Sequence, residues 1–294
     1  MSQKNFAFGQ VQKHLGAKKY YAALSHLSSL SLQYSKDIEF LTLLSETQAG
    51  LKDFTNLIKT QSEIVRQRGS TQDKISLMRC YYRANQRNHA LDVGLELQSQ
   101  TLSTIEEQVL SKLLVKIFLE ENDFEGAQEV ITRALMSEAD DFLLWAQGIV
   151  LLNCDNKERA LDYFRKAVQL NPRNDQAWVS LAMMHKDMGD EDLYVANLEK
   201  AIDLNPYNAA ALKLLAGSTQ RKSERVTATF EHLRFYLAEY CFDEDISLCH
   251  IQMLCQVKQW DIAELEIEKL LLNEPESQSF KKIKKSMFEA QNLC

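Results

Sequence analysis

The sequence predicts an all-α protein in which helix-turn-helix repeats stack one on another. The prolines Pro172, Pro206 and Pro275 are the only ones in 294 residues, and the intervals between them are 34 and 69 residues. Proline lacks an amide hydrogen and disfavours helix in the residue before it, so each one is expected to end a helix at the same point of a repeat. A period near 34 is the length of a helix-turn-helix repeat. Only nine glycines are present, which leaves few turns for a sheet protein.

Composition agrees with a folded, elongated array of helices. The chain is 45% hydrophobic and 26% charged, values that are ordinary for a folded domain. No run approaches the roughly 18 apolar residues that span a bilayer, and the first ten residues do not resemble a secretory signal, so we expect no membrane insertion. The six cysteines are irregularly spaced without a CxxC pair. They predict reduced, mostly buried thiols and a cytoplasmic location.

Charge is unevenly distributed along the chain. The formal net charge is -7, which argues against nucleic-acid binding. Residues 1–100 contain 13 Lys/Arg and 8 Asp/Glu, whereas residues 101–294 contain 21 and 33. This division suits a protein whose two ends meet different partners, or one that associates head to tail with itself. A solvated surface without such a role explains it equally well.

Two adjacent segments, residues 141–174 and 175–208, show the repeat most clearly. Each contains large and small apolar residues in a first helix, a polar turn, and a second helix that closes at a proline. The pattern is carried by Gly148, Ala160, Phe164, Ala167 and Leu170 in the first copy and by Trp178, Leu181, Ala182, Leu198, Ala201 and Leu204 in the second. It resembles the tetratricopeptide repeat family. His185 and Tyr194 depart from the family pattern, in which a large hydrophobic residue and a small one are usual at those positions.

The resemblance implies a right-handed superhelical solenoid of about eight stacked repeats with a C-terminal capping helix. In register with the two clear copies, the other repeats span residues 4–37, 38–70, 71–104, 108–140, 209–242 and 244–277. The repeat over 209–242 is placed by Leu212, Leu215, Ala216 and Ala228. The chain then divides into divergent repeats at 1–107, repeats at 108–277 that are clearest at 141–208, and a capping helix at 278–294. A simple helical bundle is the alternative for the first hundred residues.

Residue sizes account for this pattern in physical terms. Two antiparallel helices approach closely only where a residue is small, which places Gly148, Ala160, Ala182 and Ala201 at the contacts. One pair cannot bury both of its apolar faces, so it stacks on the next pair and the terminal repeats differ.

The last segment of the chain is expected to close the stack as a capping helix. Phe280, Ile283 and Met287 follow helical spacing, and four lysines occupy the other faces. The alternative is a basic helix that touches an acidic partner or a membrane.

Signatures of catalysis are missing from the sequence. It contains no GxSxG, phosphate-loop, GxGxxG or HExxH motif, and its six histidines are scattered. The neighbours Cys249 and His250 point about 100° apart on one helix, so they do not form a nucleophile-base pair. We therefore expect no enzyme activity, no cofactor and no metal.

The surface most informative about function is the groove of the solenoid. In the tetratricopeptide repeat family, which this sequence resembles, the first helix of each repeat lines that groove. Reading those positions gives a basic stretch followed by an apolar one: Arg79, Tyr82, Arg83, Lys112, Lys116, Trp145, Ile149, Leu152, Met183 and Lys186. Cationic groups pair with carboxylates or phosphates, and exposed apolar groups anchor apolar side chains. Together they suit an acidic peptide with hydrophobic anchors, or a helix laid in the groove.

Two simpler interpretations apply to these residues. The cations lie at i, i+4 spacing and equally fit a solvated helix face, and Trp145 equally fits a packing role because Leu144 stands where the family usually has an aromatic residue. Some family members hold a C-terminal carboxylate with a lysine and asparagine clamp. Lys112 is suitably placed for it, but Lys116 replaces the asparagine and Ala146 replaces its partner in the next repeat, so that mode is disfavoured.

The sequence thus favours a non-catalytic adaptor or scaffold whose groove binds a segment of another protein. The alternative is a structural subunit that self-associates through its end repeats. Sedimentation at increasing salt separates the two, because a monomer at all concentrations in low salt excludes self-assembly.

Overall fold

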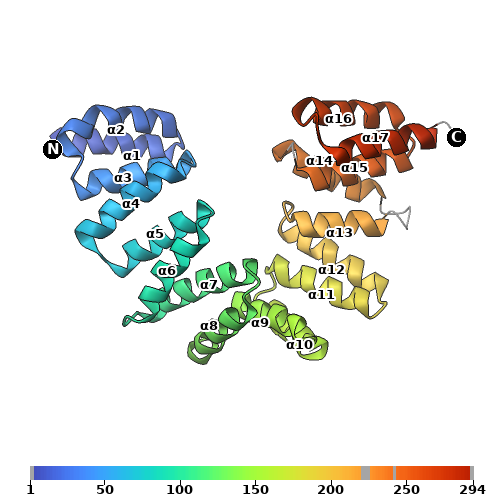
Figure 1. The fold of residues 1–294 in the computed structure, drawn as a ribbon, viewed down its shortest axis with the longest axis horizontal. Coiled ribbons are helices and arrows are strands. Elements are labelled where there is room, and N and C mark those ends of the chain that lie inside the picture. Colours follow the sequence, from blue (N-terminus) through green and yellow to red (C-terminus); the bar gives the residue numbers. More distant parts are fainter. Residues whose placement is uncertain (1–2, 220–225, 241–242, 292–294) are drawn as a thin grey trace. The chain divides into compact units, whose positions relative to one another are not determined.

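The computed structural model describes residues 3–219, 226–240 and 243–291, and every regular element in these ranges is a helix (Figure 1). The all-α prediction is therefore confirmed. Contacts divide the chain into two compact units, Met1–Ala139 and Asp140–Cys294, each of which is described by itself. No helix within the described ranges combines the length and the apolar character needed to cross a membrane.

Unit 1 contains four antiparallel helix pairs, each made of a first and a second helix. The pairs are α1 (Gln3–Gly16) with α2 (Tyr20–Tyr34), α3 (Ile38–Gly50) with α4 (Phe54–Arg68), α5 (Thr71–Arg83) with α6 (Arg87–Gln98), and α7 (Thr104–Glu120) with α8 (Phe124–Ser137). The pairs from α1 to α6 continue the helix-turn-helix order of the repeats through the first hundred residues. The start expected for the second segment, residue 108, lies one turn inside α7.

Unit 2 contains four more pairs and a closing helix. The pairs are α9 (Asp141–Asn153) with α10 (Lys157–Leu170), α11 (Asp175–Asp187) with α12 (Glu191–Leu204), α13 (Ala209–Thr219) with α14 (Val226–Glu239), and α15 (Glu244–Gln256) with α16 (Trp260–Asn273), followed by α17 (Gln278–Gln291). This order confirms the eight repeats and the capping helix. The right-handed superhelix stays a prediction.

The turn inside each repeat has a fixed backbone conformation. Seven such turns contain one residue with φ between 54° and 79°: Lys18, Lys52, Asn85, Asn122, Asp155, Gly189 and Lys258. The amide of the next residue donates to a carbonyl oxygen five residues earlier, at 2.8 to 2.9 Å in each case, which is the Schellman arrangement that closes a helix. Part of the turn between α13 and α14 lies outside the described residues.

Consecutive repeats are also joined by a recurring hydrogen-bonded cluster. Asp175, at the start of α11, accepts hydrogen bonds from the amide groups of Asn205 at 2.7 Å and Asn208 at 2.8 Å. Asn208 also accepts from the backbone amide of Ala211 at 3.0 Å, so it ties α11 to the beginning of α13. One repeat earlier, Asp141 accepts hydrogen bonds from the amide groups of Asn171 at 3.0 Å and Asn174 at 2.8 Å. The period of the sequence therefore recurs in individual hydrogen bonds.

Small residues stand where the helices approach most closely. A methyl group added at Gly148 would overlap the ring of Phe164, and Ala160, Ala182 and Ala201 are fully buried. The expected contact positions are confirmed.

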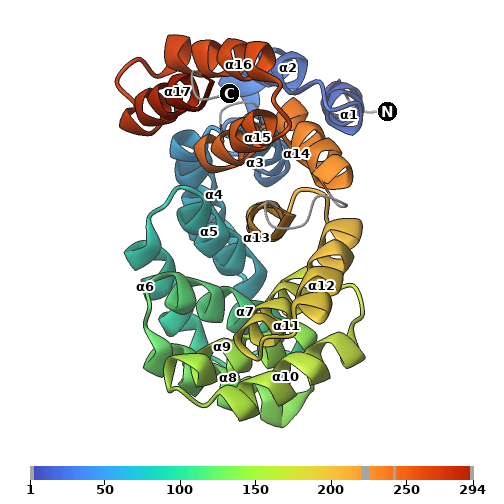
Figure 2. The ribbon, with the colours of Figure 1, turned by 90° about the vertical axis from the view of Figure 1, so that its right-hand side faces the viewer.

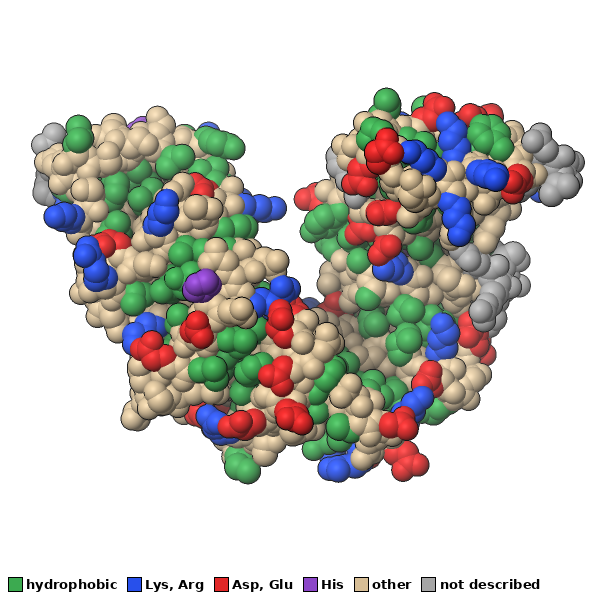
Figure 3. All heavy atoms as spheres, in the orientation of Figure 1, with side chains coloured by type: hydrophobic (Ala, Val, Ile, Leu, Met, Phe, Trp, Pro, Cys, Tyr) green, Lys and Arg blue, Asp and Glu red, His purple; other side chains and the backbone are tan. Residues whose placement is uncertain are grey.

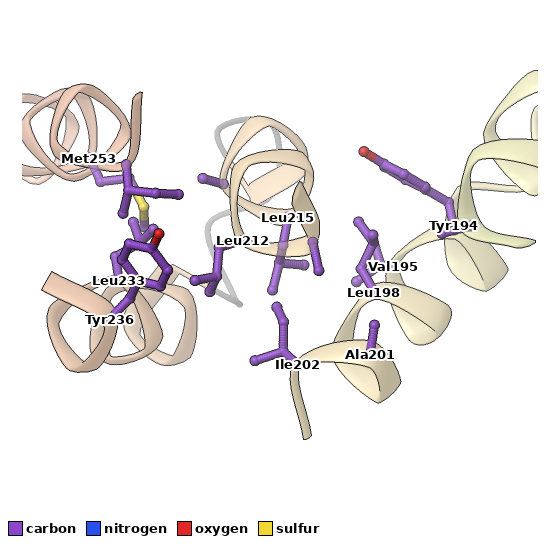
Figure 4. Close-up of a cluster of buried hydrophobic side chains, with 14 residues drawn as sticks. Tyr194, Val195, Leu198, Ala201, Ile202, Leu212, Leu215, Leu233, Tyr236 and Met253 are labelled. Atoms are coloured by element: carbon purple, nitrogen blue, oxygen red, sulfur yellow. The ribbon is translucent and has the colours of Figure 1, made fainter. Parts of the chain in front are cut away.

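Tyr194, which departs from the family pattern, is accommodated in the core of unit 2. It is 2% exposed within the cluster that Figure 4 shows, and its hydroxyl donates to the Leu214 carbonyl at 3.1 Å. The large side chain of Tyr194 therefore extends to the next repeat and does not disturb the packing of its own repeat.

Two expectations about individual residues are wrong. In α14 Thr229 is buried, at 1% exposure, in the place expected for Ala228, which is exposed, because the helix meets its neighbours one residue later than the register implied. The cysteines are less buried than expected: Cys80 is buried, Cys249 and Cys255 are half-buried and Cys154 is exposed. Cys241 and Cys294 lie outside the described residues.

The capping helix α17 packs through its predicted apolar face. Phe280 and Met287, each 2% exposed, join a core cluster with Ile251 and Ile267. Lysines on its other faces form surface ion pairs, Lys281 with Glu276 at 3.0 Å and Lys284 with Glu268 at 3.3 Å. These pairs support the capping role over the basic-helix alternative.

The turn geometry leads to a stability test. Lysine at φ 58° is unfavourable relative to glycine, so we expect Lys258→Gly to stabilise unit 2 by about 0.5 to 1 kcal/mol in chemical denaturation. The control Lys200→Gly, an exposed position inside α12, should destabilise by about 1 kcal/mol. Destabilisation by both substitutions would contradict the role assigned to the turn.

The aspartate cluster leads to a second test. Asp175→Ala leaves the amides of Asn205 and Asn208 without their acceptor, and we expect a loss of about 1 to 3 kcal/mol of unfolding free energy. Asp203→Ala, at an exposed position on α12, is the matched control and should change stability by less than about 0.5 kcal/mol. Equal effects in the two variants would show that the cluster does not join the repeats.

Candidate partner-binding surfaces

In unit 1, two of the predicted groove residues line one cavity. Arg79 and Arg83 lie one helical turn apart on α5, and the cavity of about 340 Å³ that they border is also walled by α3 and α4. Its apolar wall includes Leu57 and Ile64, and the exposed carboxylate of Glu46 also lines it. The first helices α3 and α5 of two consecutive repeats thus contribute to one recess, together with the second helix α4.

The arginines in this cavity are not equivalent. The Arg68 guanidinium donates to Asp73 through Nε at 2.7 Å, and this bond holds the pKa of the nearly buried Asp73 carboxyl below its usual range. Arg79 and Arg83 are exposed and have no hydrogen-bond or ion-pair partner among the described residues. Arg68 therefore stabilises the fold, whereas the charges of the other two are not paired with any described residue.

The remaining predicted residues of unit 1 contact one another. The hydroxyl of the partly buried Tyr82 donates to the Glu120 carboxylate, and burial together with this bond raises the pKa of Tyr82. Lys116 is exposed, with Nζ 5.3 Å from the centre of the Tyr82 ring. Lys112 is half-buried and already interacts with other groups of the protein. Lysine and arginine side chains are scattered over the face of unit 1 seen in Figure 3, without forming one continuous basic patch.

In unit 2, the predicted apolar anchors also serve the core. Trp145, Ile149 and Leu152 on α9 are half-buried and pack against a cluster that contains Phe164. The indole Nε1 of Trp145 donates to the Ser180 hydroxyl on α11 at 2.9 Å. Packing thus uses much of the surface of these side chains, and only a fraction of it is available to a ligand.

Met183 and Lys186 are the exposed predicted residues of α11. Met183 is 38% exposed, and Lys186 has its Nζ 5.1 Å from the centre of the Tyr194 ring. They offer a partner one flexible apolar side chain and one cation.

Sequence reasoning missed a groove at the end of unit 2. A cavity of about 580 Å³ lies between α15 and α17 and is lined by Leu248, Cys255, Trp260, Lys282 and Ile283, among others. The spacing of Phe280, Ile283 and Met287 identified the helix, but it did not indicate that Ile283 is only half-covered.

The titratable groups do not form a catalytic pair. Burial raises the pKa of the Cys249 thiol and lowers the pKa of His250, so both side chains are held in their neutral forms. Burial likewise raises the pKa of Cys80 to about 11. A nucleophilic cysteine needs the opposite shift of its pKa. In the ranges that the structure describes, no three His, Cys, Asp or Glu side chains gather in a way that would hold a metal ion.

The paired helices, their recurring turns and the small residues at their contacts define a tetratricopeptide-repeat protein. Solved structures share this fold. A tetratricopeptide repeat protein from Parabacteroides merdae matches with a TM-score of 0.53 at 14% identity, over 86% of this chain and 98% of that chain. The structure of the APC/C hetero-tetramer Cut9-Hcn1 matches with a TM-score of 0.57 at 13% identity, over 83% and 48%.

The family is shown by the sequence itself. The model of the family described as anaphase promoting complex subunit 8 / Cdc23 matches residues 48–241, more than half of the chain, and the chain belongs to this family. Proteins of this kind are typically non-catalytic scaffolds.

Curated relatives match over shorter stretches. The chain is 25% identical over 162 residues to anaphase-promoting complex subunit 3 of Schizosaccharomyces pombe, which covers 54% of this chain and 24% of that protein. It is 28% identical over 115 residues to cellulose synthase operon protein C of Escherichia coli, covering 39% and 10%. The chain therefore spans about a quarter or less of the length of these relatives.

Proposed function

We propose that the protein is a non-catalytic scaffold that binds an acidic segment of another protein along the first helices of its repeats. The observation that carries this proposal is the pair Arg79 and Arg83. Unit 1 contains six arginines, all of them described, and Arg66, Arg68, Arg87 and Arg133 pair with carboxylates. Arg79 and Arg83 have no such partner and border a recess instead.

The chemistry of the recess specifies the ligand. Two guanidinium groups one turn apart can each hold a carboxylate of an extended or helical segment. The apolar wall formed by Leu57 and Ile64 is largely buried, so only a small apolar group fits beside the charges. Met183 and Lys186 form a separate surface of mixed character on unit 2.

Relatives support a role in assembly. The Cut9-Hcn1 structure is of a hetero-tetramer of the APC/C, which makes a subunit of a multi-protein complex a suitable partner for this chain as well. A location in the cytoplasm belongs to the same proposal. Self-association through the end repeats stays a second possibility, because Tyr21 and Leu32 of α2 are 81% and 100% exposed.

A displayed library of random 12-residue peptides provides the test. We expect selection on the wild-type protein to enrich peptides rich in Asp and Glu, and we expect Arg79→Glu with Arg83→Glu to weaken their binding at least about tenfold, because two charge-assisted contacts become repulsive. The melting temperature should stay the same, since both side chains are exposed without partners.

The matched control keeps the change in charge and moves it elsewhere. Arg159→Glu with Arg173→Glu alters two exposed arginines of α10 and the loop after Pro172. Binding that falls equally in both double variants would show a general charge effect. A library that yields no acidic peptides would contradict the proposal.

A further inference from the structure

A second cavity in unit 2 is lined mainly by the second helices α14 and α16. It measures about 570 Å³ and is bordered by α14, α15 and α16, which are neighbours in Figure 2. Its apolar lining includes Phe230, Val257 and Ile262, and its polar lining includes Glu231 and Glu266. The volume falls in the range of sites that take small ligands or single anchoring side chains.

His250 of α15 lines this cavity and has an unusual environment. The side chain is 8% exposed, and its Nε2 atom has no hydrogen-bond partner. The ring of Phe230 lies 4.8 Å from the imidazole, centre to centre. A buried polar atom without a partner costs about 1 to 3 kcal/mol. This nitrogen is closed off from solvent, so a ligand atom that reaches it after a small displacement of the side chains that cover it would be stabilised.

The repeat register shows that the histidine is a departure. His250 is the seventh residue of its repeat, and five other repeats have leucine at the seventh position: Leu44, Leu77, Leu114, Leu181 and Leu215. Leucine would fill this position without an unsatisfied atom. Histidine at this position therefore makes the repeat less stable than leucine would.

The surroundings keep the imidazole neutral. Burial lowers the pKa of His250, the nearby Glu266 opposes this shift, and Arg234 adds to it. Arg234 and Glu266 are themselves engaged, with Glu231 at 3.2 Å and with Lys269 at 2.8 Å. A neutral imidazole has one nitrogen that donates and one that accepts a hydrogen bond. A hydroxyl group both donates and accepts, so it satisfies Nε2 in either tautomer.

We propose that this cavity, the His250 cavity, binds the phenol side chain of a tyrosine on a partner protein, with the tyrosine hydroxyl hydrogen-bonded to His250 Nε2. The ring of the tyrosine would lie against Phe230, Val257 and Ile262, which match its apolar body. Aromatic side chains with a polar tip are frequent anchors at protein interfaces because one end is apolar and the other needs a partner.

Two tripeptides test the site. The probes are N-acetyl-Ala-Tyr-Ala-amide and N-acetyl-Ala-Phe-Ala-amide, which differ by one hydroxyl group, and their binding is measured by titration calorimetry and by the histidine side-chain signals in NMR. We expect the tyrosine peptide to bind about three- to tenfold more tightly than the phenylalanine peptide, and to shift the His250 signal.

Replacement of the histidine by the residue common in the other repeats separates the hydrogen bond from the fold. His250→Leu should remove the preference for tyrosine while its melting temperature stays equal or rises, and His185→Leu on α11 should leave the preference intact. No difference between the two peptides on the wild-type protein would overturn the proposal. A tyrosine preference that persists in His250→Leu would also overturn it.

Discussion

Within each unit, a helix pair depends on the next pair to bury its second apolar face. The helices within a pair approach closely because residues such as Gly148 carry little bulk. Consecutive pairs of unit 2 are joined because Asp141 and Asp175 each accept hydrogen bonds from two asparagines that precede the next first helix. Stability in such an array is a sum of terms between neighbours. The surfaces that we propose for partner binding are ordered by this stacking.

The fold was largely predictable because large and small residues recur with the period of the repeat. Gly148, Ala160 and Ala201 marked the close contacts, and the three prolines marked the period. The turn inside each repeat is the most regular feature of the structure, but it was not apparent from the sequence. Its residue with positive φ is lysine in some repeats and asparagine, aspartate or glycine in others. Such turns tolerate these residue types at a modest cost, so composition alone does not identify them. Ala228 was placed wrongly because α14 meets its neighbours one residue later than the register of the clear repeats implies.

The candidate site was predictable only in part. The position of a residue on a first helix indicated that Arg79 and Arg83 face the groove side, but whether a charge is already paired depends on side chains from other helices. Arg68, four residues before Gln72, is bound to Asp73, and nothing in the spacing distinguishes it from Arg79. Trp145 illustrates the same limit, since its bond to Ser180 comes from the next repeat. The His250 cavity was not apparent from the sequence because it needs three helices to form.

Native-state hydrogen exchange tests the dependence of each pair on its neighbour most directly. Gly148→Val inserts bulk against Phe164 at the contact of α9 with α10. The account predicts that protection falls most in α9 and α10, less in α11 and α12, and least in α15 and α16, because stabilisation passes between adjacent repeats. An equal loss of protection throughout unit 2, or a loss confined to the altered pair, would contradict it.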